Sequence, residues 1–185
     1  SAANSSKKLK DPFSEIYNSG LAMEPPADHE IWSWLSFYST RYNQLLRAYA
    51  RNVAGQGFKI VPTIEISRKT DPYLRDKTLL DIQKLKNFYG HPHTKIQSKR
   101  WLEESFPELL TKMAMDREAI GNGYLEISRE QGGLPAGLWH IPGVSMRLMS
   151  NLEGFVQFSI GRSQYIYFKN FGDPMIMDYR SGEII

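Results

Sequence analysis

Residues 119 to 129 read Ala-Ile-Gly-Asn-Gly-Tyr-Leu-Glu-Ile-Ser-Arg, and within this stretch the pattern of the chain changes from helix to strand. A segment with helical spacing ends before Gly121-Asn122-Gly123, and apolar and polar side chains alternate after it. A glycine at the end of a helix can adopt the left-handed conformation that terminates the helix, and alternation with a period of two is typical of a strand. The stretch therefore predicts a corner between a helix and a strand.

Several short β-type segments follow this corner. They are Tyr124–Ser128, Leu138–Ile141, Ser145–Met149, Phe155–Ile160 and Gln164–Phe168. Turns that contain glycine separate them, at 131–133, 153–154 and 161–162. Because tight turns join antiparallel neighbours, we expect an antiparallel β meander over about residues 123 to 185.

Helical spacing dominates the chain before the corner. Apolar side chains recur at intervals of three and four over 31–54, 76–89 and 101–120, as in amphipathic helices. The inward faces predicted by this spacing are Leu35, Tyr38, Tyr42, Leu45, Leu46, Tyr49 and Val53, then Leu79, Ile82, Leu85, Phe88 and Tyr89, and finally Leu109, Leu110, Met113 and Ile120. Ser105 before Pro107 offers a second helix start within the last segment. A helical first part, over about 31–120, that packs on an antiparallel meander is an α+β fold.

The segments beside the first helix have their own signals. Gly55 or Gly57 is expected to end that helix, since either can take the left-handed cap. Beyond them, Phe58–Ile66 alternates well enough to predict a strand.

Residues 1–30 are rich in serine, proline and charge. Prolines at positions 12, 25 and 26 interrupt any helix there. We therefore expect an extended N-terminal arm that is anchored by Phe13, Ile16 and Tyr17, followed by one domain over 31–185.

Length and composition exclude several classes of protein. The chain has 185 residues with 41% hydrophobic and 23% charged residues, which suits a globular protein with its own core. No segment approaches the roughly 20 apolar residues that a membrane-spanning helix needs, so we expect no membrane association. The absence of cysteine excludes disulfides, thiolate metal sites and cysteine nucleophiles, and it favours an intracellular setting.

The net charge of +3 is too small to indicate tight nucleic-acid binding by itself. Its excess lies in the first 69 residues, which hold 9 basic and 6 acidic side chains, including the cluster Lys7, Lys8 and Lys10. Aromatic residues make up 12% of the chain and could stack on bases. At helical and strand spacing, however, they favour core or subunit contacts.

Candidate catalytic residues are few. His91 and His93 flank Pro92, but two imidazoles without a third ligand at a recognised spacing make a poor metal site, and a turn is favoured. His140 is expected to be a strand histidine with a hydrogen-bond partner. The acidic pairs on the helices diverge, and no P-loop, dinucleotide-binding glycine pattern or G-x-S-x-G elbow occurs. We therefore expect no catalytic residue, no metal ligand, no cofactor and no enzymatic activity.

An ordered series of short motifs resembles a known family. The series is Gly121-Asn122-Gly123-Tyr124-Leu125-Glu126 with Arg129, then Gly133 and Pro135, then Leu138 to Pro142 with Met146-Arg147, and finally Phe168-Lys169-Asn170-Phe171-Gly172-Asp173-Pro174 with Asp178 and Ser181-Gly182-Glu183. Earlier, 51–54 and 57–60 look like the first helix and strand of the same family. In this order the motifs resemble the portal proteins of long-tailed bacteriophages and prophages, over about residues 34 to 183.

The resemblance implies structural roles for a set of family-motif residues. They are Gly121, Asn122, Gly123, Tyr124, Glu126, Pro142, Arg147, Phe171, Gly172, Asp173 and Pro174. It also implies that the chain is the N-terminal wing of a longer subunit, with the stem helices and the clip beyond Ile185.

Portal proteins form a ring, typically of twelve subunits, at one vertex of the capsid. The resemblance implies that double-stranded DNA is packaged through this ring by terminase and is ejected through it into the tail. It further implies contacts with capsid and head-tail adaptor proteins, a place in the virion, and assembly in the host cytoplasm.

Two other functions remain open from the residues alone. One is a metal-dependent enzyme of DNA metabolism that would use His91, His93 and an acidic residue. The other is a sequence-independent DNA-binding module, which would show tight binding with a steep dependence on salt.

Overall fold

The computed structural model of the protein describes residues 13–62, 71–91, 104–130, 132–159, 164–173, 175 and 177–183. The chain divides into two compact units. Unit 1 combines residues 1–29 with residues 144–185, and unit 2 comprises residues 30–143.

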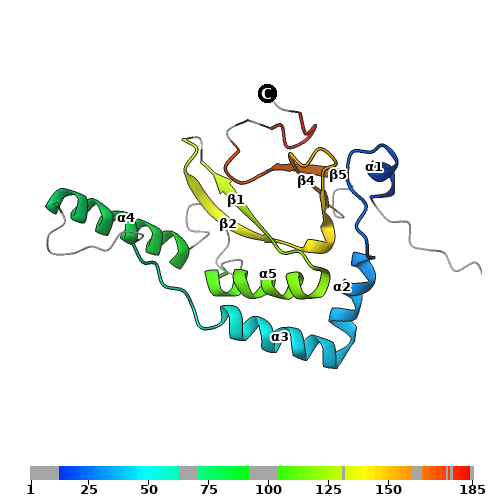
Figure 1. Cartoon of the computed structure of the whole chain (residues 1–185), viewed down its shortest axis with the longest axis horizontal. Helices are drawn as coiled ribbons and strands as arrows, with labels where there is room; N and C mark the ends of the chain where they lie inside the picture. The colour runs from blue at the N-terminus through cyan, green and yellow to red at the C-terminus, as the bar shows by residue number, and fades with distance from the viewer. Residues whose placement is uncertain are drawn as a thin grey trace, which may run out of the picture. The chain divides into compact units, whose positions relative to one another are not determined.

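Unit 2 is built from helices and one β hairpin. Its elements are α2 (His29–Tyr38, which begins at the unit boundary), α3 (Thr40–Ala54), α4 (Pro72–Gly90), α5 (Phe106–Ile120), β1 (Tyr124–Arg129) and β2 (Pro135–Ile141). The two strands are antiparallel, with Tyr124 opposite Ile141. α5 lies between α3 and the hairpin and contacts both (Figure 1).

Unit 1 is built on a three-stranded sheet. Its elements are α1 (Ser14–Asn18), β3 (Met146–Leu148), β4 (Gly154–Ser159) and β5 (Gln164–Lys169), and a short 3-10 turn over Gly143–Ser145 precedes β3. The strand order is β3-β4-β5, with antiparallel neighbours. Phe13, Ile16, Ala22 and Val156 form its buried core. The N-terminal segment thus supplies most of the core of a sheet that lies far along the chain.

The α+β class and the five strands agree with the sequence prediction. The expected single meander is instead two separate sheets in the described part of the chain. Pro142 and the turn that starts at Gly143 separate β2 from β3. Because proline has no backbone N–H to donate to a ladder, the strand pairing stops there.

The helix expected over 31–54 is two helices. Ser39 interrupts it in an extended conformation, and its Oγ accepts a hydrogen bond from the N–H of Tyr42 at 3.4 Å. Serine stabilises a helix start in this way because the first N–H groups of a helix have no partner within it. The end of α3 matches the prediction, and Gly57 takes the left-handed conformation with φ of 80°.

The buried face of α3 differs from the predicted one. Leu46, Ala50 and Ala54 are buried, whereas Leu45 and Val53 are exposed. α3 packs against α5, and small alanine side chains allow two helices to approach closely with few voids. The larger apolar side chains form a second face beside the first one.

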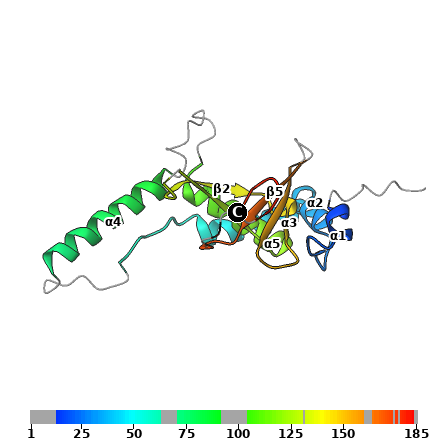
Figure 2. The same cartoon turned by 90° about the horizontal axis from the view of Figure 1, so that it is seen from above.

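α4 begins earlier than the predicted residue 76. Asp71 caps it, since its Oδ1 accepts hydrogen bonds from the N–H groups of Tyr73 and Leu74 at 2.7 and 3.3 Å. Pro72 occupies the first turn, where a missing N–H costs nothing. The helix is straight (Figures 1 and 2) and buries none of its side chains. Of the inward face predicted for α4, Ile82, Phe88 and Tyr89 are half-buried, whereas Leu79 and Leu85 are exposed.

The strand predicted over 58–66 is absent from its described part, residues 58–62, and residues 63–66 lie outside the described residues. The ring of Phe58 instead packs against the rings of Tyr89 and Phe106, with centroids 5.8 and 5.0 Å away. Aromatic packing thus replaces strand pairing at this position.

α5 begins at the predicted second start. The N–H of Ser105 donates to the carboxylate of Glu108 at 2.7 Å, as in a capping box. Residues 101–103, which the sequence assigned to the same helix, lie outside the described residues. α5 ends at Gly121, whose φ of 84° is the left-handed cap that the sequence predicted.

Residues 13–29 are not the extended arm that the sequence suggested. They form α1, a turn and an isolated bridge between Ala22 and Met149. The anchoring side chains were identified correctly, because Phe13 and Ile16 are buried. The short helix forms because these side chains pack on the sheet. Residues 1–12 lie outside the described residues.

None of the helices in the described ranges is both long enough and apolar enough to cross a membrane.

The corner after α5 depends on close backbone contact. A Cβ atom at Gly123 would lie 2.4 Å from the carbonyl oxygen of Met113. We predict that Gly123→Ala lowers the free energy of unfolding by about 1–3 kcal/mol, the range for overpacking. Urea unfolding measures this change.

Gly132→Ala is the matched control, because a Cβ atom there meets nothing within 4 Å. This variant should stay within about 0.5 kcal/mol of the wild type. Equal effects of the two substitutions would contradict the close contact at Gly123.

Candidate functional site

The family-motif residues lie in two sets rather than in one cluster. Gly121, Asn122, Gly123, Tyr124, Glu126 and Pro142 belong to unit 2, and Arg147, Phe171, Gly172 and Asp173 belong to unit 1. Pro174 lies outside the described residues. Each set is considered within its own unit.

In unit 2 the structure brings two corners together. A Cβ atom on Gly143 would lie 2.6 Å from Cδ1 of Ile120 and 2.9 Å from the carbonyl oxygen of Asn122. The corner that follows α5 therefore contacts the corner that follows β2. This second corner begins at Pro142, which is exposed. Only a residue without a side chain fits at Gly143 without displacing its neighbours.

Asp116 joins these corners to α5. Its Oδ2 lies 2.9 Å from Nε2 of His140 and accepts a hydrogen bond from the N–H of Gly143 at 2.8 Å. His140 is thus a strand histidine with a hydrogen-bond partner, as the sequence predicted. One carboxylate oxygen ties the helix to the end of the hairpin, and this arrangement is structural.

Glu126 and Tyr124 lie on β1, both half-buried. Glu126 is opposite Trp139 on the neighbouring strand. Burial raises the pKa of the Glu126 carboxyl, because a low-dielectric environment disfavours the charged form. On the same strand pair the indole N–H of Trp139 donates to the hydroxyl of Ser128 at 3.3 Å.

In unit 1 the central polar group is Arg147, which is 4% exposed. Its Nη1 donates to the carbonyl oxygens of Val144 and Met146 at 2.9 and 2.8 Å, and its Nε donates to the hydroxyl of Tyr17. The guanidinium carbon lies 4.1 Å from the ring centroid of Phe13. This side chain therefore joins the N-terminal segment to β3.

The environment of Arg147 suits a buried cation that has no ion pair. Within the described ranges, no carboxylate forms a salt bridge with it. The planar guanidinium instead uses carbonyl oxygens, a phenol and an aromatic face. Burial of a charge is tolerated only when its donors are satisfied, so Arg147 depends on the position of Phe13 and Tyr17.

The remaining motif residues, Phe171, Gly172 and Asp173, lie in the turn after β5. Gly172 has φ of 84°, and the N–H of Met175 donates to Oδ1 of Asp173 at 2.8 Å. Nζ of Lys169 donates to the carbonyl oxygens of Asp173 and Met175 at 2.6 and 2.7 Å. The turn is held firmly, yet Phe171 on it is 82% exposed.

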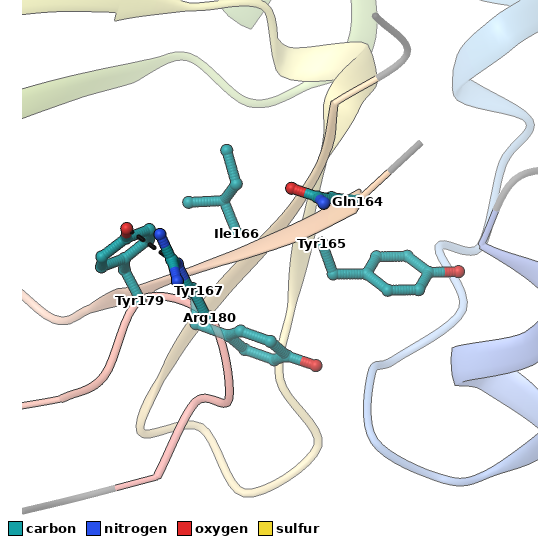
Figure 3. Close-up of a pocket in the computed structure, with 6 residues that line it drawn as sticks. All are labelled: Gln164, Tyr165, Ile166, Tyr167, Tyr179 and Arg180. Atoms are coloured by element: carbon teal, nitrogen blue, oxygen red, sulfur yellow. Dashed lines mark hydrogen bonds between the residues drawn. The ribbon is translucent and has the colours of Figure 1, made fainter. Parts of the chain in front are cut away.

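An open groove of about 610 Å³ lies beside β5 and is lined by Gln164, Tyr165, Ile166, Tyr167, Tyr179 and Arg180. The N–H of Tyr167 donates to the carbonyl of Tyr179 at 2.8 Å, and Nε of Arg180 donates to the hydroxyl of Tyr179 at 2.9 Å (Figure 3). The described residues of the lining include neither a carboxylate nor an imidazole.

The described residues contain no group of three or more histidine, cysteine or acidic side chains that could hold a metal ion. His91 is the cap residue at the end of α4. His93, the other histidine of the alternative metal site, lies outside the described residues.

An exposed apolar surface of unit 2 lies on α2 and α3. Its members are Ile31, Trp32, Trp34, Phe37, Tyr38, Leu45, Tyr49 and Val53, and we call it the α2–α3 apolar surface. The rings of Trp34 and Tyr38 stack with centroids 4.7 Å apart. Monomeric proteins seldom expose large contiguous apolar patches, so this surface is a candidate for contact with another molecule.

Four of these side chains, Tyr38, Leu45, Tyr49 and Val53, were predicted to face inward but are exposed. α2 has apolar side chains on nearly all of its sides, and Glu30 is its one charged residue apart from the terminal His29. A helix that is apolar all round must be covered. This composition was the sequence signal for an exposed apolar surface on α2.

Comparison with known proteins links the chain to phage-like elements. It is 27% identical over 210 residues to XkdE, a protein of the phage-like element PBSX of Bacillus subtilis (strain 168). It is also 26% identical over 198 residues to the uncharacterized protein YqbA of the same strain. No family model matches the chain, and no solved structure matches it.

The alignments include 100% and 94% of this chain but only 40% and 37% of XkdE and YqbA. The chain therefore spans less than half the length of either relative. At this level of identity the comparison shows similarity to a protein of a phage-like element.

The buried guanidinium provides a test of unit 1. We predict that Arg147→Lys lowers the free energy of unfolding by about 1–3 kcal/mol, since lysine cannot reproduce the forked donors and leaves buried carbonyl groups unpaired. Amide hydrogen exchange of β3, β4 and β5 in increasing urea measures this change, because these strands belong to unit 1.

The control is Arg180→Lys, because Arg180 is exposed. It should change the free energy of unfolding by less than about 0.5 kcal/mol. A loss at position 147 no greater than at position 180 would show that the guanidinium contacts do not stabilise unit 1.

His29 makes unit 1 sensitive to pH. It is 8% exposed, and its Nδ1 has no hydrogen-bond partner in the described structure. Burial, and then the positive charge of Arg147, lower the pKa of His29 below 6.5, while Asp28 acts in the opposite direction. The folded protein therefore binds this proton less tightly than the unfolded chain does.

By linkage, the contribution of His29 to stability is lost as the pH falls below about 6.5 towards the folded pKa. We predict that the free energy of unfolding of the wild type decreases more steeply in this range than that of His29→Gln. Above the ordinary histidine pKa of about 6.5, the difference between the two proteins should be constant. Parallel profiles over the whole range would refute the effect.

Proposed function

We propose that this chain is the wing-like part of a phage portal protein, a structural subunit of the head-tail connector ring. In this role it is not an enzyme and uses no cofactor. Its partners would be other copies of itself, terminase, and the capsid and head-tail adaptor proteins. Double-stranded DNA would pass through the ring during packaging and ejection.

The similarity to XkdE is the observation that carries the proposal. This similarity extends over the whole chain. The portal-like series of motifs from Gly121 to Glu183 likewise indicates a protein derived from a phage. In the structure, Gly121, Asn122 and Gly123 form the corner after α5. Arg147 is buried, and Gly172 and Asp173 belong to the hydrogen-bonded turn after β5. These are geometric roles, which support a structural protein.

Size supports a ring. A compact domain of 185 residues would have a radius of gyration of about 16 Å, comparable to the thickness of a DNA duplex, and each of the two units of this chain is smaller. One copy therefore cannot surround DNA, and a passage requires several copies related by symmetry. We place this ring at the portal vertex of the virion, after assembly in the host cytoplasm.

The weak net charge of +3 is compatible with a conduit. Each phosphate that a protein neutralises adds affinity that must be lost again before the DNA can move. A channel component therefore works better without a dense basic patch.

Negative-stain electron microscopy of the full-length protein tests the proposal. We expect rings with a central hole, typically of twelve subunits as in portal proteins. A homogeneous population of monomers or compact dimers would contradict it.

Binding measurements separate the two rival functions. We expect weak binding of duplex DNA by the purified chain at moderate salt, and no stoichiometric binding of divalent metal. Tight binding with a steep salt dependence would favour a DNA-binding module. Stoichiometric metal binding that is lost in His93→Ala would favour a metal-dependent enzyme.

A further inference from the structure

Residues 13–23, which we call the 13–23 segment, complete a sheet that they do not adjoin in the chain. Residues 30–143, which lie between the segment and the sheet in the sequence, form unit 2. Phe13, Ile16 and Ala22 belong to the segment and make up three of the four residues in the buried core of unit 1. The segment is therefore an essential part of unit 1 that is held in place by noncovalent contacts.

The end of the segment pairs with an edge of the sheet. Two backbone hydrogen bonds, each of 2.9 Å, join residues 21–23 to residues 148–150, and each side donates one of them. They flank the antiparallel bridge between Ala22 and Met149. The other edge of β3 pairs with β4. The N–H and C=O groups at the edge of a sheet can pair equally well with a strand from another chain.

The seat of the segment on the sheet cannot stay empty. Arg147 is 4% exposed, its Nε donates to the hydroxyl of Tyr17, and its guanidinium lies over the ring of Phe13. Without the segment this buried cation would lose both contacts. Each copy of unit 1 therefore needs a 13–23 segment, although none of these contacts specifies which copy supplies it.

The connection between the segment and α2 is short and stiff. It consists of residues 24–28, of which four are exposed and none belongs to a helix or strand. Pro25 and Pro26 have a fixed φ, and a residue before proline is restricted to extended conformations. Five extended residues reach about 17 Å at most. Such a connection holds the segment in one direction and does not act as a flexible tether.

We infer that the 13–23 segment is exchanged between copies, so that the segment of one subunit occupies the seat on the sheet of the next. The contacts in the seat are the same in both arrangements, so exchange of this identical element adds little cost beyond association. Neighbouring copies in a ring have a fixed spacing, which gives the segment a high effective concentration at the adjacent seat. As a mode of ring assembly the inference rests on the proposed portal function.

Disulfide trapping tests the exchange. The hydrogen bonds flank the pair of Ala22 and Met149, and the Cα atoms of such a pair lie about 4.5 Å apart, within the range that a disulfide spans. Ala22→Cys and Met149→Cys are combined in the full-length protein, with any cysteine outside residues 1–185 replaced by serine, and the protein is oxidised with diamide. Residues 1–185 contain no other cysteine, and both positions are buried, so random collisions form few disulfides.

We expect covalent oligomers on a non-reducing denaturing gel, because each disulfide then links two subunits. Their yield should be several-fold above that of the matched control, Ala22→Cys with Met146→Cys. Met146 is as buried as Met149, at 3% and 4% exposure, but the bridge to Ala22 is formed by Met149.

Two results would overturn the inference. Monomers with one internal disulfide would show that each segment stays on the sheet of its own chain. Two free thiols per chain, counted with a thiol reagent, would show that the seat differs from the one described. Far-ultraviolet circular dichroism before oxidation confirms that the variant is folded. A second pair, Met23→Cys with Leu148→Cys, gives the same measurement at less buried positions that one backbone hydrogen bond joins.

The stiffness of the connection is tested in the same double-cysteine protein. Pro25→Gly with Pro26→Gly makes the connection flexible, and we expect several-fold fewer covalent oligomers and more internal disulfide. Ala27→Gly is the control within the same connection and should leave the products unchanged. Equal product ratios with and without the two prolines would contradict the role of the connection.

The inference and the portal proposal can fail separately. Rings in which every subunit carries an internal disulfide would retain the portal proposal and overturn the exchange. Covalent oligomers without rings in negative stain would retain the exchange and overturn the portal proposal.

Discussion

A buried guanidinium is the interaction on which unit 1 depends. Arg147 lies beneath the N-terminal segment, with its donors directed to Tyr17 and to the carbonyl oxygens of Val144 and Met146, and with the ring of Phe13 against its face. Within the described residues it has no carboxylate partner, so its charge is compatible with burial only while these contacts hold. Two distant parts of the chain therefore fold as one unit. The sheet and the turns that it supports occupy fixed positions because this contact orders the segment that covers them.

Unit 2 also depends on contacts between separate parts of the chain, here between α5 and the hairpin of β1 and β2. Its helix and hairpin meet at glycines that admit no side chain, and one oxygen of Asp116 joins the two corners. In each unit a few polar contacts join elements that lie far apart in the sequence. In the described part of the chain, exposed apolar side chains gather on α2, α3 and the turns of unit 1 instead of lining a closed pocket. This distribution suits a protein whose surfaces meet other protein surfaces.

Local signals predicted the elements better than their packing. Alternation and glycine marked the strands and the corner at Gly121, and Ser105 marked the true start of α5, since these features depend on nearby residues. The buried face of α3 was not predictable, because large apolar side chains and alanines form adjoining faces and only the approach of α5 selects the alanines. The burial of Arg147 was also beyond a sequence pattern, since arginine is usually exposed and its partner Phe13 lies far away in the chain. Those long-range contacts are the ones that define the candidate assembly surfaces.

The similarity to a protein of a phage-like element, the geometric roles of the motif residues and the exposed α2–α3 apolar surface all favour a subunit that works by assembly. The most direct measurement is amide hydrogen exchange over residues 29–54, compared between this chain alone and the full-length protein. Docking of a partner should slow exchange in α2 and α3, because local opening then requires loss of the contact. We predict strong additional protection of these two helices in the full-length protein. Exchange in α2 and α3 that is as fast in the full-length protein as in the isolated chain would contradict an assembly role for this surface.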